Sequence, residues 1–194
     1  MRLELIRHGQ TDWNRDGRLQ GSSDIPLNET GRGQAVEAAA ILADQNLRAI
    51  VSSPLMRARE TARIIADILG IELGASYDDL IERDYASCEG KVPSTPIPDE
   101  PNAEYPDIET RESVVARGMR AINEIRDTRL PIDGPDATIA AVCHGTIIRF
   151  TLAAILGQEI PHIHNAAINE IEWTGDEWRV LSVNGQPSAM SFTA

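Results

Sequence analysis

Short apolar runs alternate along the chain with longer amphipathic stretches, which is the order expected of strands joined by helices in an α/β protein. The last of these runs, Thr138 to Cys143, is almost entirely apolar, as a strand covered on both faces should be. Because helical stretches separate the strands, the sheet should be mostly parallel. The three predicted strands are residues 3–6, 49–52 and 138–143.

Four longer stretches place apolar residues three and four positions apart, as on one face of a helix. Ser53 and Pro54 are predicted to be the N-cap and first residue of one helix, and Thr30 to be the cap of another. Gly70 and Gly157 are residues of the type that most often ends a helix. The four predicted helices lie between residues 30 and 42, 54 and 69, 112 and 129, and 145 and 156.

Two stretches near the C-terminus alternate apolar and polar residues, as half-buried strands do. They cover residues 170–173 and 178–183, and Thr174 to Glu177 between them supply turn chemistry. This pattern predicts a hairpin at a sheet edge. We therefore expect residues 1–194 to form a single-domain, three-layer α/β/α fold, with a mostly parallel central sheet and an antiparallel edge hairpin near the C-terminus.

Residues 91–108 carry five prolines and several acids, with almost no apolar period. Proline at this density prevents regular structure. Ordered elements flank the stretch closely, so it is predicted to be an acidic, proline-rich loop or lid at about 84–112 that covers something. The alternative is a surface loop without a function.

Length and charge narrow the classes of function. The chain has 194 residues, the size of one domain, and a formal net charge of −12, which excludes the basic footprint of a nucleic-acid-binding protein or a polybasic membrane patch. No apolar run approaches the ~18 residues of a membrane span, and the stretch from Met1 to Ile6 is too short and too charged to be the apolar region of a signal peptide. Cys88 and Cys143 are far apart and expected to be reduced thiols. A cytoplasmic protein is expected.

Each predicted parallel strand ends in polar residues that can take part in catalysis. The first is followed by His8 and Gly9, the second by Ser53 with Arg57 one helical turn later, and the third by His144. Since ligands of open α/β sheets bind outside the carboxyl ends of the strands, these side chains should converge on one pocket. Two helix N-termini at the same pocket would favour an anion, and phosphate is the obvious candidate.

Phosphoryl transfer requires the groups that this pocket would contain. The transferred group spreads negative charge over three oxygens, which the guanidinium forks of Arg7 and Arg57 can bind. A histidine can be the nucleophile and form a phosphohistidine that water later hydrolyses. A carboxylic acid must then protonate the leaving alkoxide and afterwards activate the water.

Four blocks of sequence resemble a known family. The run Leu5 to Asn14, which contains Arg7-His8-Gly9, resembles the Arg-His-Gly signature of the histidine phosphatase superfamily, also called phosphoglycerate-mutase-like. Three later blocks resemble the family in the same order, and four ordered blocks across nearly the whole chain are more specific than a single triplet. The later blocks are 52–62, 80–90 and 142–145.

The resemblance implies roles by position. His8 would be the phosphorylated nucleophile and Glu82 the proton donor and later base, with Arg7, Arg57 and His144 completing the catalytic set. No metal and no cofactor are implied, and a homodimer is expected only by analogy with family members. The residues expected to bind the substrate phosphate are Arg7, Asn14, Gln20, Gly21, Arg57, His144, Gly145 and Thr146, the last through its backbone N–H.

The identity of the acid is open at this point. Asp79, Asp84 and Glu89 lie close enough in sequence to compete with Glu82. The family usually has glycine at the position of Ala86 and often tryptophan at that of Cys88, so the loop around the acid departs from the family pattern.

The expected function is metal-independent hydrolysis of a small phosphorylated metabolite. A phosphoglycerate mutase-type phosphotransferase is the alternative, and a non-catalytic phosphate-binding protein on the same fold is a third. Residues 64–112 hold thirteen acidic and three basic residues, whereas residues 1–63 hold eight acidic and nine basic residues. We therefore hypothesise that an acidic rim disfavours polyanionic substrates and prefers small monophosphates, including amine-bearing ones. The alternative is that these acids only solvate a loop.

Overall fold

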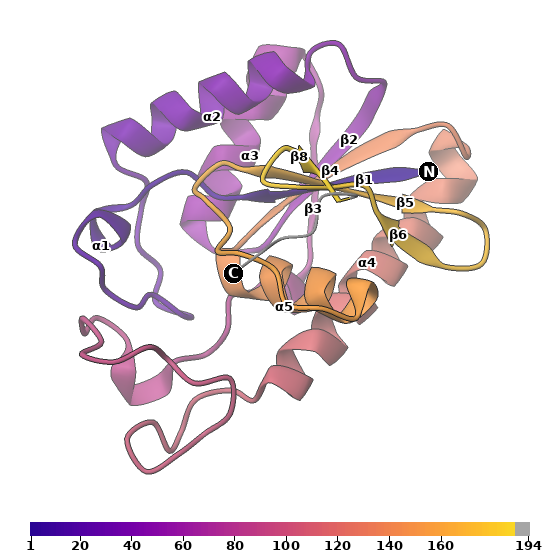
Figure 1. The fold of residues 1–194 in the computed structure, drawn as a ribbon. Helices are drawn as coiled ribbons and strands as arrows, with labels where there is room; N and C mark the ends of the chain where they lie inside the picture. The colour runs from indigo at the N-terminus through magenta and orange to yellow at the C-terminus, as the bar shows by residue number, and fades with distance from the viewer. Residues whose placement is uncertain (189–194) are drawn as a thin grey trace.

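The computed structural model describes residues 1–188, and a six-stranded sheet in the order β3-β2-β4-β1-β5-β6 forms its centre (Figure 1). Strands β1 to β4 are parallel to one another, whereas β5 and β6 continue the sheet beyond β1 as an antiparallel hairpin. This confirms the predicted mostly parallel sheet with an edge hairpin. The strands are β1 (Arg2–Arg7), β2 (Leu47–Ser52), β3 (Leu73–Ser76), β4 (Thr138–Cys143), β5 (Ile168–Trp173) and β6 (Trp178–Val180).

Two helices cover each face of the sheet. Helices α2 (Glu29–Leu42) and α3 (Met56–Leu69) pack on one face, where Ile6 of β1 is buried. Helices α4 (Arg111–Asp133) and α5 (Gly145–Leu156) pack on the other, against Leu3 and Leu5. Because alternate residues of β1 point to opposite faces, one strand contributes to both cores, and the predicted three-layer architecture is confirmed. The shorter elements are helix α1 (Asp12–Arg15) and the 3₁₀ turns η1 (Asp78–Leu80) and η2 (Ala86–Cys88).

Two predicted helix starts are wrong. Helix α3 begins at Met56, its N-cap is Leu55 without a side-chain bond, and the Met56 N–H donates instead to the Asp24 carboxylate at 2.6 Å. Helix α2 begins at Glu29, because Asn28 and not Thr30 accepts a bond from the N–H of the first turn. A residue distant in the sequence therefore replaces the predicted local cap of α3.

The first strand of the C-terminal hairpin is two residues longer than predicted, and the second is shorter. The stretch 178–183 divides after Val180, and β7 (Ser182–Val183) pairs with β8 (Gln186–Pro187) instead of continuing β6. Asn184 and Gly185 both have positive φ, which is the signature of a tight hairpin turn that an Asn-Gly pair favours. Strand β3 was not predicted, because it is a four-residue edge strand with only one half-buried leucine in its pattern.

The proline-rich loop, defined here as residues 91–110, contains no helix or strand, as its composition predicted. It packs through a small apolar cluster in which Tyr105 and Ile108 are buried against Tyr85 and Cys88. The Arg83 guanidinium, 1% exposed, also donates to three carbonyl oxygens at 2.7–2.8 Å. The loop is thus attached to the domain by apolar packing and by one buried cation. The three acceptors belong to Pro98, Asp99 and Glu109.

Hydrogen bonds between strand ends bring the predicted catalytic segments together. The His8 N–H donates to the Cys143 carbonyl at 2.9 Å, and the Ser53 N–H donates to the Val142 carbonyl at 2.8 Å. The strands β1, β4 and β2 therefore end side by side. No helix of the described chain is both long and apolar enough to cross a membrane.

Candidate active site

A cavity of about 480 Å³ opens at the carboxyl ends of β1 and β4. The predicted site residues that line it are Arg7, His8, Asn14, Gln20, Gly21, Arg57, Glu82, Gly145 and Thr146. His144 lies directly behind the wall, with its ring centroid 5.2 Å from that of His8. The structure therefore gathers all of the residues that the sequence analysis selected. The first and last of them, Arg7 and Thr146, are 139 positions apart in the sequence.

The imidazole of His8 is fixed in one tautomer. Its Nδ1 lies 2.7 Å from the Gly9 carbonyl oxygen, which can only accept, so Nδ1 carries the proton and Nε2 keeps its lone pair. Burial lowers the pKa of His8 well below 6.5, and the nearby charges of Arg57 and Arg7 lower it further. At neutral pH, His8 is therefore an uncharged imidazole whose Nε2 can attack an electrophile.

A tight backbone contact holds the segment after His8. A Cβ on Gly9 would lie 2.3 Å from the Gly31 carbonyl oxygen at the start of α2, a separation that no side chain tolerates. Glycine at position 9 lets the chain pass α2 at this distance and leaves its carbonyl facing the His8 ring. The close approach therefore contributes to the tautomer of His8.

Arg57 is buried and pre-oriented. It belongs to the first turn of α3, is 0% exposed, and donates to the carbonyl oxygens of Gly21 (2.8 Å) and Ser23 (2.7 Å). Burial lowers its pKa to about 10, so the guanidinium is still protonated at neutral pH. The Glu89 carboxylate in turn accepts from the N–H and hydroxyl groups of Ser22 and Ser23. Gly21, predicted to bind phosphate, thus has its carbonyl directed to Arg57.

Arg7 approaches the cavity from the end of β1. One of its nitrogens donates to the Ile163 carbonyl at 2.6 Å and lies 2.9 Å from Nε2 of His162. Its Nε is buried without a partner, and a Cβ on Gly145 would lie 3.2 Å from that atom. The guanidinium thus keeps hydrogen-bonding capacity for a ligand, while small Gly145 leaves room for it.

His144 is paired with Ser53. The hydroxyl of Ser53 lies 2.8 Å from Nε2 of His144, and Nδ1 of the same ring is buried without a partner. Burial and the charge of Arg57 lower the pKa of His144 well below 6.5, so the ring is neutral. Ser53, predicted as a helix cap, is therefore a partner of the second histidine.

The Glu82 carboxylate lies at the N-terminus of α5. It accepts from the N–H of Thr146 at 3.0 Å and of Ile147 at 3.1 Å, where the helix dipole favours a negative charge. The Thr146 N–H, predicted as a phosphate donor, is therefore engaged by Glu82 in this structure. Of the four candidate acids, Glu82 is the one that lines the cavity.

The other candidate acids have partners elsewhere. Asp79 pairs with Arg120, Asp84 accepts from the Ala86 N–H, and Glu89 holds the serine pair described above. Their placement favours Glu82 as the acid of the site.

Asn14 and Gln20 lie on the wall formed by the segment after β1. The side-chain oxygen of Asn14 accepts from Thr11 and Asn165, and within residues 1–188 its Nδ2 donates no hydrogen bond. Gln20 is buried and accepts from the Thr11 hydroxyl at 3.0 Å. Both amides are thus oriented by hydrogen bonds and face the cavity.

Sequence reasoning missed several residues of the wall. Tyr85 donates to or accepts from the Thr146 hydroxyl at 2.7 Å, and His162 contacts Arg7. Arg149 lines the cavity from α5, one turn beyond Gly145. A single arginine within an otherwise uncharged helix, four positions after Gly145, was a signal that could have identified it. His162 lies in a loop and carried no such signal.

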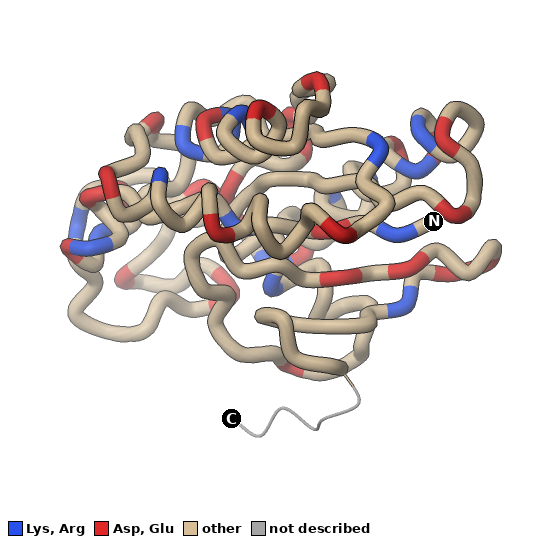
Figure 2. Tube along the Cα trace, turned by 90° about the horizontal axis from the view of Figure 1, so that it is seen from above, with Lys and Arg blue, Asp and Glu red and all other residues tan. Residues whose placement is uncertain are grey.

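The acids of the proline-rich loop do not surround the cavity. Of residues 84–112, Tyr85 and Ile97 line it, and neither is charged at neutral pH. Acidic positions are spread over much of the chain (Figure 2). The cavity wall itself holds one acid, Glu82, and four arginines, which favours an anionic ligand, and the acidic rim stays a hypothesis about residues outside the wall. The arginines are Arg7, Arg18, Arg57 and Arg149.

The family follows from comparison with known proteins. Residues 3–186 match the family model described as "Histidine phosphatase superfamily (branch 1)". The chain belongs to the histidine phosphatase superfamily. The match covers all four blocks that carried the resemblance, and membership makes this protein a histidine phosphatase-family enzyme.

Named relatives of this histidine phosphatase include phosphatases and a mutase. The chain is 35% identical over 185 residues to the uncharacterized phosphatase PhoE of Bacillus subtilis, covering 93% of this chain and 92% of PhoE. It is 27% identical over 193 residues to the probable phosphoglycerate mutase GpmB of Photorhabdus laumondii, covering 92% and 87%. A mycobacterial glucosyl-3-phosphoglycerate phosphatase complexed with VO3 superposes with a TM-score of 0.80 at 30% identity, covering 94% and 97%.

Metal ligands are not grouped in the described part of this histidine phosphatase. No cluster of three or more His, Cys, Asp and Glu side chains within residues 1–188 is arranged to hold a metal ion. Cys88 and Cys143 are both buried and unpaired with each other, and burial raises the pKa of the Cys143 thiol.

Proposed function

We propose that this enzyme hydrolyses small phosphate monoesters through a phosphohistidine on His8, without a metal ion. One observation supports it above the others: His8 is a neutral imidazole with Nδ1 bonded to a carbonyl, so its Nε2 lone pair is free. The charges of Arg7 and Arg57 lie close enough to lower its pKa. They would also stabilise the negative charge of a phosphoryl group at Nε2.

The proposed first step transfers the phosphoryl group to His8. Nε2 attacks phosphorus, the bond from phosphorus to the ester oxygen breaks, and the leaving alkoxide takes a proton from Glu82 in its acid form. In the second step water attacks the phosphohistidine, Glu82 as carboxylate takes a proton from that water, and the bond from phosphorus to Nε2 breaks. Inorganic phosphate leaves and both residues return to their starting forms.

The phosphoryl oxygens would be held by donors that have capacity left. Arg7, Arg57 and the Asn14 amide face the cavity, and the unpartnered Nδ1 of His144 lies beside His8. For Nδ1 to donate, it must carry the ring proton, and Nε2 then accepts from the Ser53 hydroxyl. Ser53 would thus select the donating tautomer of His144.

A panel of phosphate monoesters with EDTA present tests the proposal. We expect the purified enzyme to release inorganic phosphate at an undiminished rate in EDTA, because no step uses a metal ion. The panel should include p-nitrophenyl phosphate and several alkyl phosphates. Activity that disappears in EDTA and returns with an added divalent cation would contradict the proposal.

A mutase is the alternative function, and the GpmB relative gives it weight. A mutase must hold its phosphorylated intermediate tightly, which calls for extra basic residues near the site. Residues 84–110 contain one basic residue, Lys91, so hydrolysis is favoured. Incubation with 3-phosphoglycerate distinguishes the two activities. Release of phosphate supports hydrolysis, whereas isomerised product without phosphate release overturns it.

Arg149 is proposed to select substrates that carry a carboxylate besides the phosphate. Its nearest acid, Asp99, is 3.7 Å away and is held more closely by Arg111, at 2.6 Å. Arg149 therefore keeps donors for an anionic group of the substrate, and a guanidinium binds a carboxylate through two bonds. The mycobacterial relative is named for a substrate of this chemistry.

Arg149→Met should remove the preference for a carboxylate. O-phosphoserine and O-phosphoethanolamine form a matched pair, since they differ by that group alone. We expect the wild type to favour O-phosphoserine in kcat/KM and the variant to lose about 10- to 100-fold on this substrate, the value of a hydrogen bond between charged groups.

Activity of Arg149→Met on O-phosphoethanolamine should change little. Arg48→Met is the control, because Arg48 is exposed on β2 outside the cavity. Equal losses of Arg149→Met on both substrates, or a wild type that favours O-phosphoethanolamine, would contradict the role of Arg149.

A further inference from the structure

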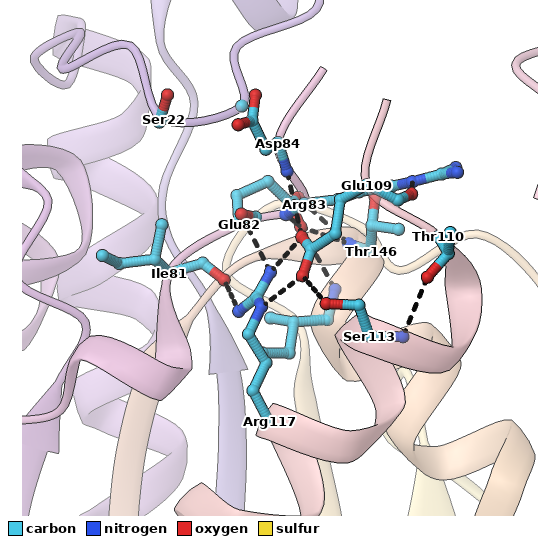
Figure 3. Close-up of polar contacts among 12 residues, drawn as sticks. Ser22, Ile81, Glu82, Arg83, Asp84, Glu109, Thr110, Ser113, Arg117 and Thr146 are labelled. Carbon is cyan, nitrogen blue, oxygen red and sulfur yellow. Dashed lines mark hydrogen bonds and ion pairs between the residues drawn. The ribbon is translucent and has the colours of Figure 1, made fainter. Parts of the chain in front are cut away.

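The backbone that carries Glu82 is held by a guanidinium from another element. Arg117 of α4 donates to the carbonyl oxygens of Asp79 (3.1 Å), Ile81 and Glu82 (3.0 Å), as Figure 3 shows for the last two. These carbonyls lie within η1 and in the segment between η1 and η2, which belongs to no strand or α-helix. Without Arg117, three carbonyls next to the proposed acid would lose their donor.

Arg117 is itself fixed by Glu109 through two parallel hydrogen bonds. Nε of Arg117 donates to Oε1 at 2.9 Å and Nη2 donates to Oε2 at 2.8 Å. The side chains of Arg117 and Glu109 are 12% and 15% exposed, so solvent screens this pair little. A guanidinium held in this way presents its remaining donors in one orientation.

The orientation of Glu109 is set by further bonds. Its carboxylate accepts from the Ser113 hydroxyl at 2.8 Å and from the Asp84 N–H at 3.2 Å. Although burial raises the pKa of Glu109, the hydrogen bonds from Arg117 and Ser113 outweigh it and lower the pKa overall. Glu109 is therefore anionic at neutral pH, and it ties the segment on both sides of Glu82 to α4 (Figure 3).

Glu82 is thus restrained at two points. Its carboxylate bonds to the N-terminus of α5 through Thr146 and Ile147, and its backbone carbonyl bonds to α4 through Arg117. The carboxylate bonds alone leave the backbone that carries Glu82 able to shift, and the backbone bond alone leaves its side-chain torsions free. Together they fix the carboxyl group at one place in the cavity that His8 lines.

We propose that the pair of Arg117 and Glu109 is a positioning device for the general acid, one that sets how well Glu82 protonates the leaving group. Arg117 does not itself line the cavity at His8, and it acts through the backbone of residues 79–82. The inference rests on the proposed function, because it requires Glu82 to be the acid.

The leaving group supplies a readout that a merely structural role would not affect. An alkoxide must be protonated as it leaves, whereas p-nitrophenolate is stable as an anion. A displaced acid therefore slows phosphoryl transfer from alkyl phosphates more than from p-nitrophenyl phosphate. The parameter to compare is kcat/KM, since it reports the first transfer and excludes hydrolysis of the phosphoenzyme.

Arg117→Lys is the main variant, because a single ammonium group cannot reach three carbonyls and a carboxylate together. We expect kcat/KM for an alkyl phosphate to fall about 10- to 100-fold, the cost of a misplaced catalytic group. For p-nitrophenyl phosphate the fall should be about threefold or less, and inhibition by inorganic phosphate should be unchanged. Glu109→Gln should also lose more kcat/KM on the alkyl phosphate than on p-nitrophenyl phosphate, although by a smaller factor. It replaces Arg117→Lys as the test variant if Arg117→Lys does not fold.

Arg120→Met is the matched control. Arg120 also lies on α4 and pairs with Asp79 through two bonds, but to the side chain and with 62% exposure. It should show neither loss nor bias. Glu82→Gln is measured in parallel as the reference for a lost acid.

The outcomes separate the two proposals. If Glu82→Gln shows no leaving-group bias, the proposed role of Glu82 is wrong. If Glu82→Gln shows the bias while folded Arg117→Lys and Glu109→Gln do not, or lose activity equally on both substrates, the positioning role of Arg117 is wrong.

Discussion

Replacing His8 with alanine should lower phosphate release from every monoester by about three orders of magnitude or more, the scale of loss when a covalent nucleophile is removed. No other ring in the site replaces it. His144 is held by Ser53 behind the cavity wall, and Nε2 of His162 is occupied by Arg7. Steady-state assays with p-nitrophenyl phosphate measure the loss, and intact mass under neutral quench measures the phosphoenzyme.

The phosphoenzyme should form in the wild type and be absent from His8→Ala. His164→Ala is the control, since His164 is exposed and lies outside the cavity lining. It should keep the wild-type rate and the phosphoenzyme. A phosphorylated His8→Ala, or one with wild-type turnover, would show that another residue is the nucleophile.

Glu82→Gln should give the second largest effect, a loss of about 10²- to 10⁴-fold in kcat/KM for alkyl phosphates, the usual contribution of a general acid. Glutamine has the size of glutamate and can still accept from the N–H groups of Thr146 and Ile147. It cannot donate an acidic proton or accept one from water. The fold should therefore persist while both proton transfers fail.

p-Nitrophenyl phosphate should separate the two steps in Glu82→Gln. The first transfer needs little acid with this substrate, whereas hydrolysis of the phosphohistidine still needs the base. We expect a burst of nitrophenol equal to the enzyme concentration, followed by slow turnover. Asp84→Asn is the control, because its side chain accepts from the Ala86 N–H outside the cavity and asparagine can do the same. A burst in Asp84→Asn, and none in Glu82→Gln, would move the acid to Asp84.

The sequence was informative where local chemistry decides structure. The apolar runs of β1 and β4 identified buried strands. Arg57 was selected from the three arginines of its helix by the resemblance of residues 52–62 to the family pattern. Local reasoning failed at the start of α3, since its first N–H is capped by Asp24, more than thirty residues away. Because Asp24 caps this helix in place of Ser53, the Ser53 hydroxyl pairs with His144 instead.

Side chains oriented by tertiary contacts were the hardest to predict. The sequence shows thirteen acids in residues 64–112, but not that Asp99 and Glu109 turn toward Arg111 and Arg117. Counting charges along the sequence therefore does not show which acids face the cavity. His162 was missed for a related reason, because its contact with Arg7 exists only after folding.

The burial of Arg83 restricts how a substrate can enter. Lifting the proline-rich loop would strip this guanidinium of three carbonyl acceptors, at ~1.5–3 kcal/mol for each lost hydrogen bond to a charged group. That cost makes an open-loop form rare. Molecules should therefore enter through the opening that the cavity already has, and the width of that opening, more than any hinge motion, should limit the size of ester that the enzyme accepts.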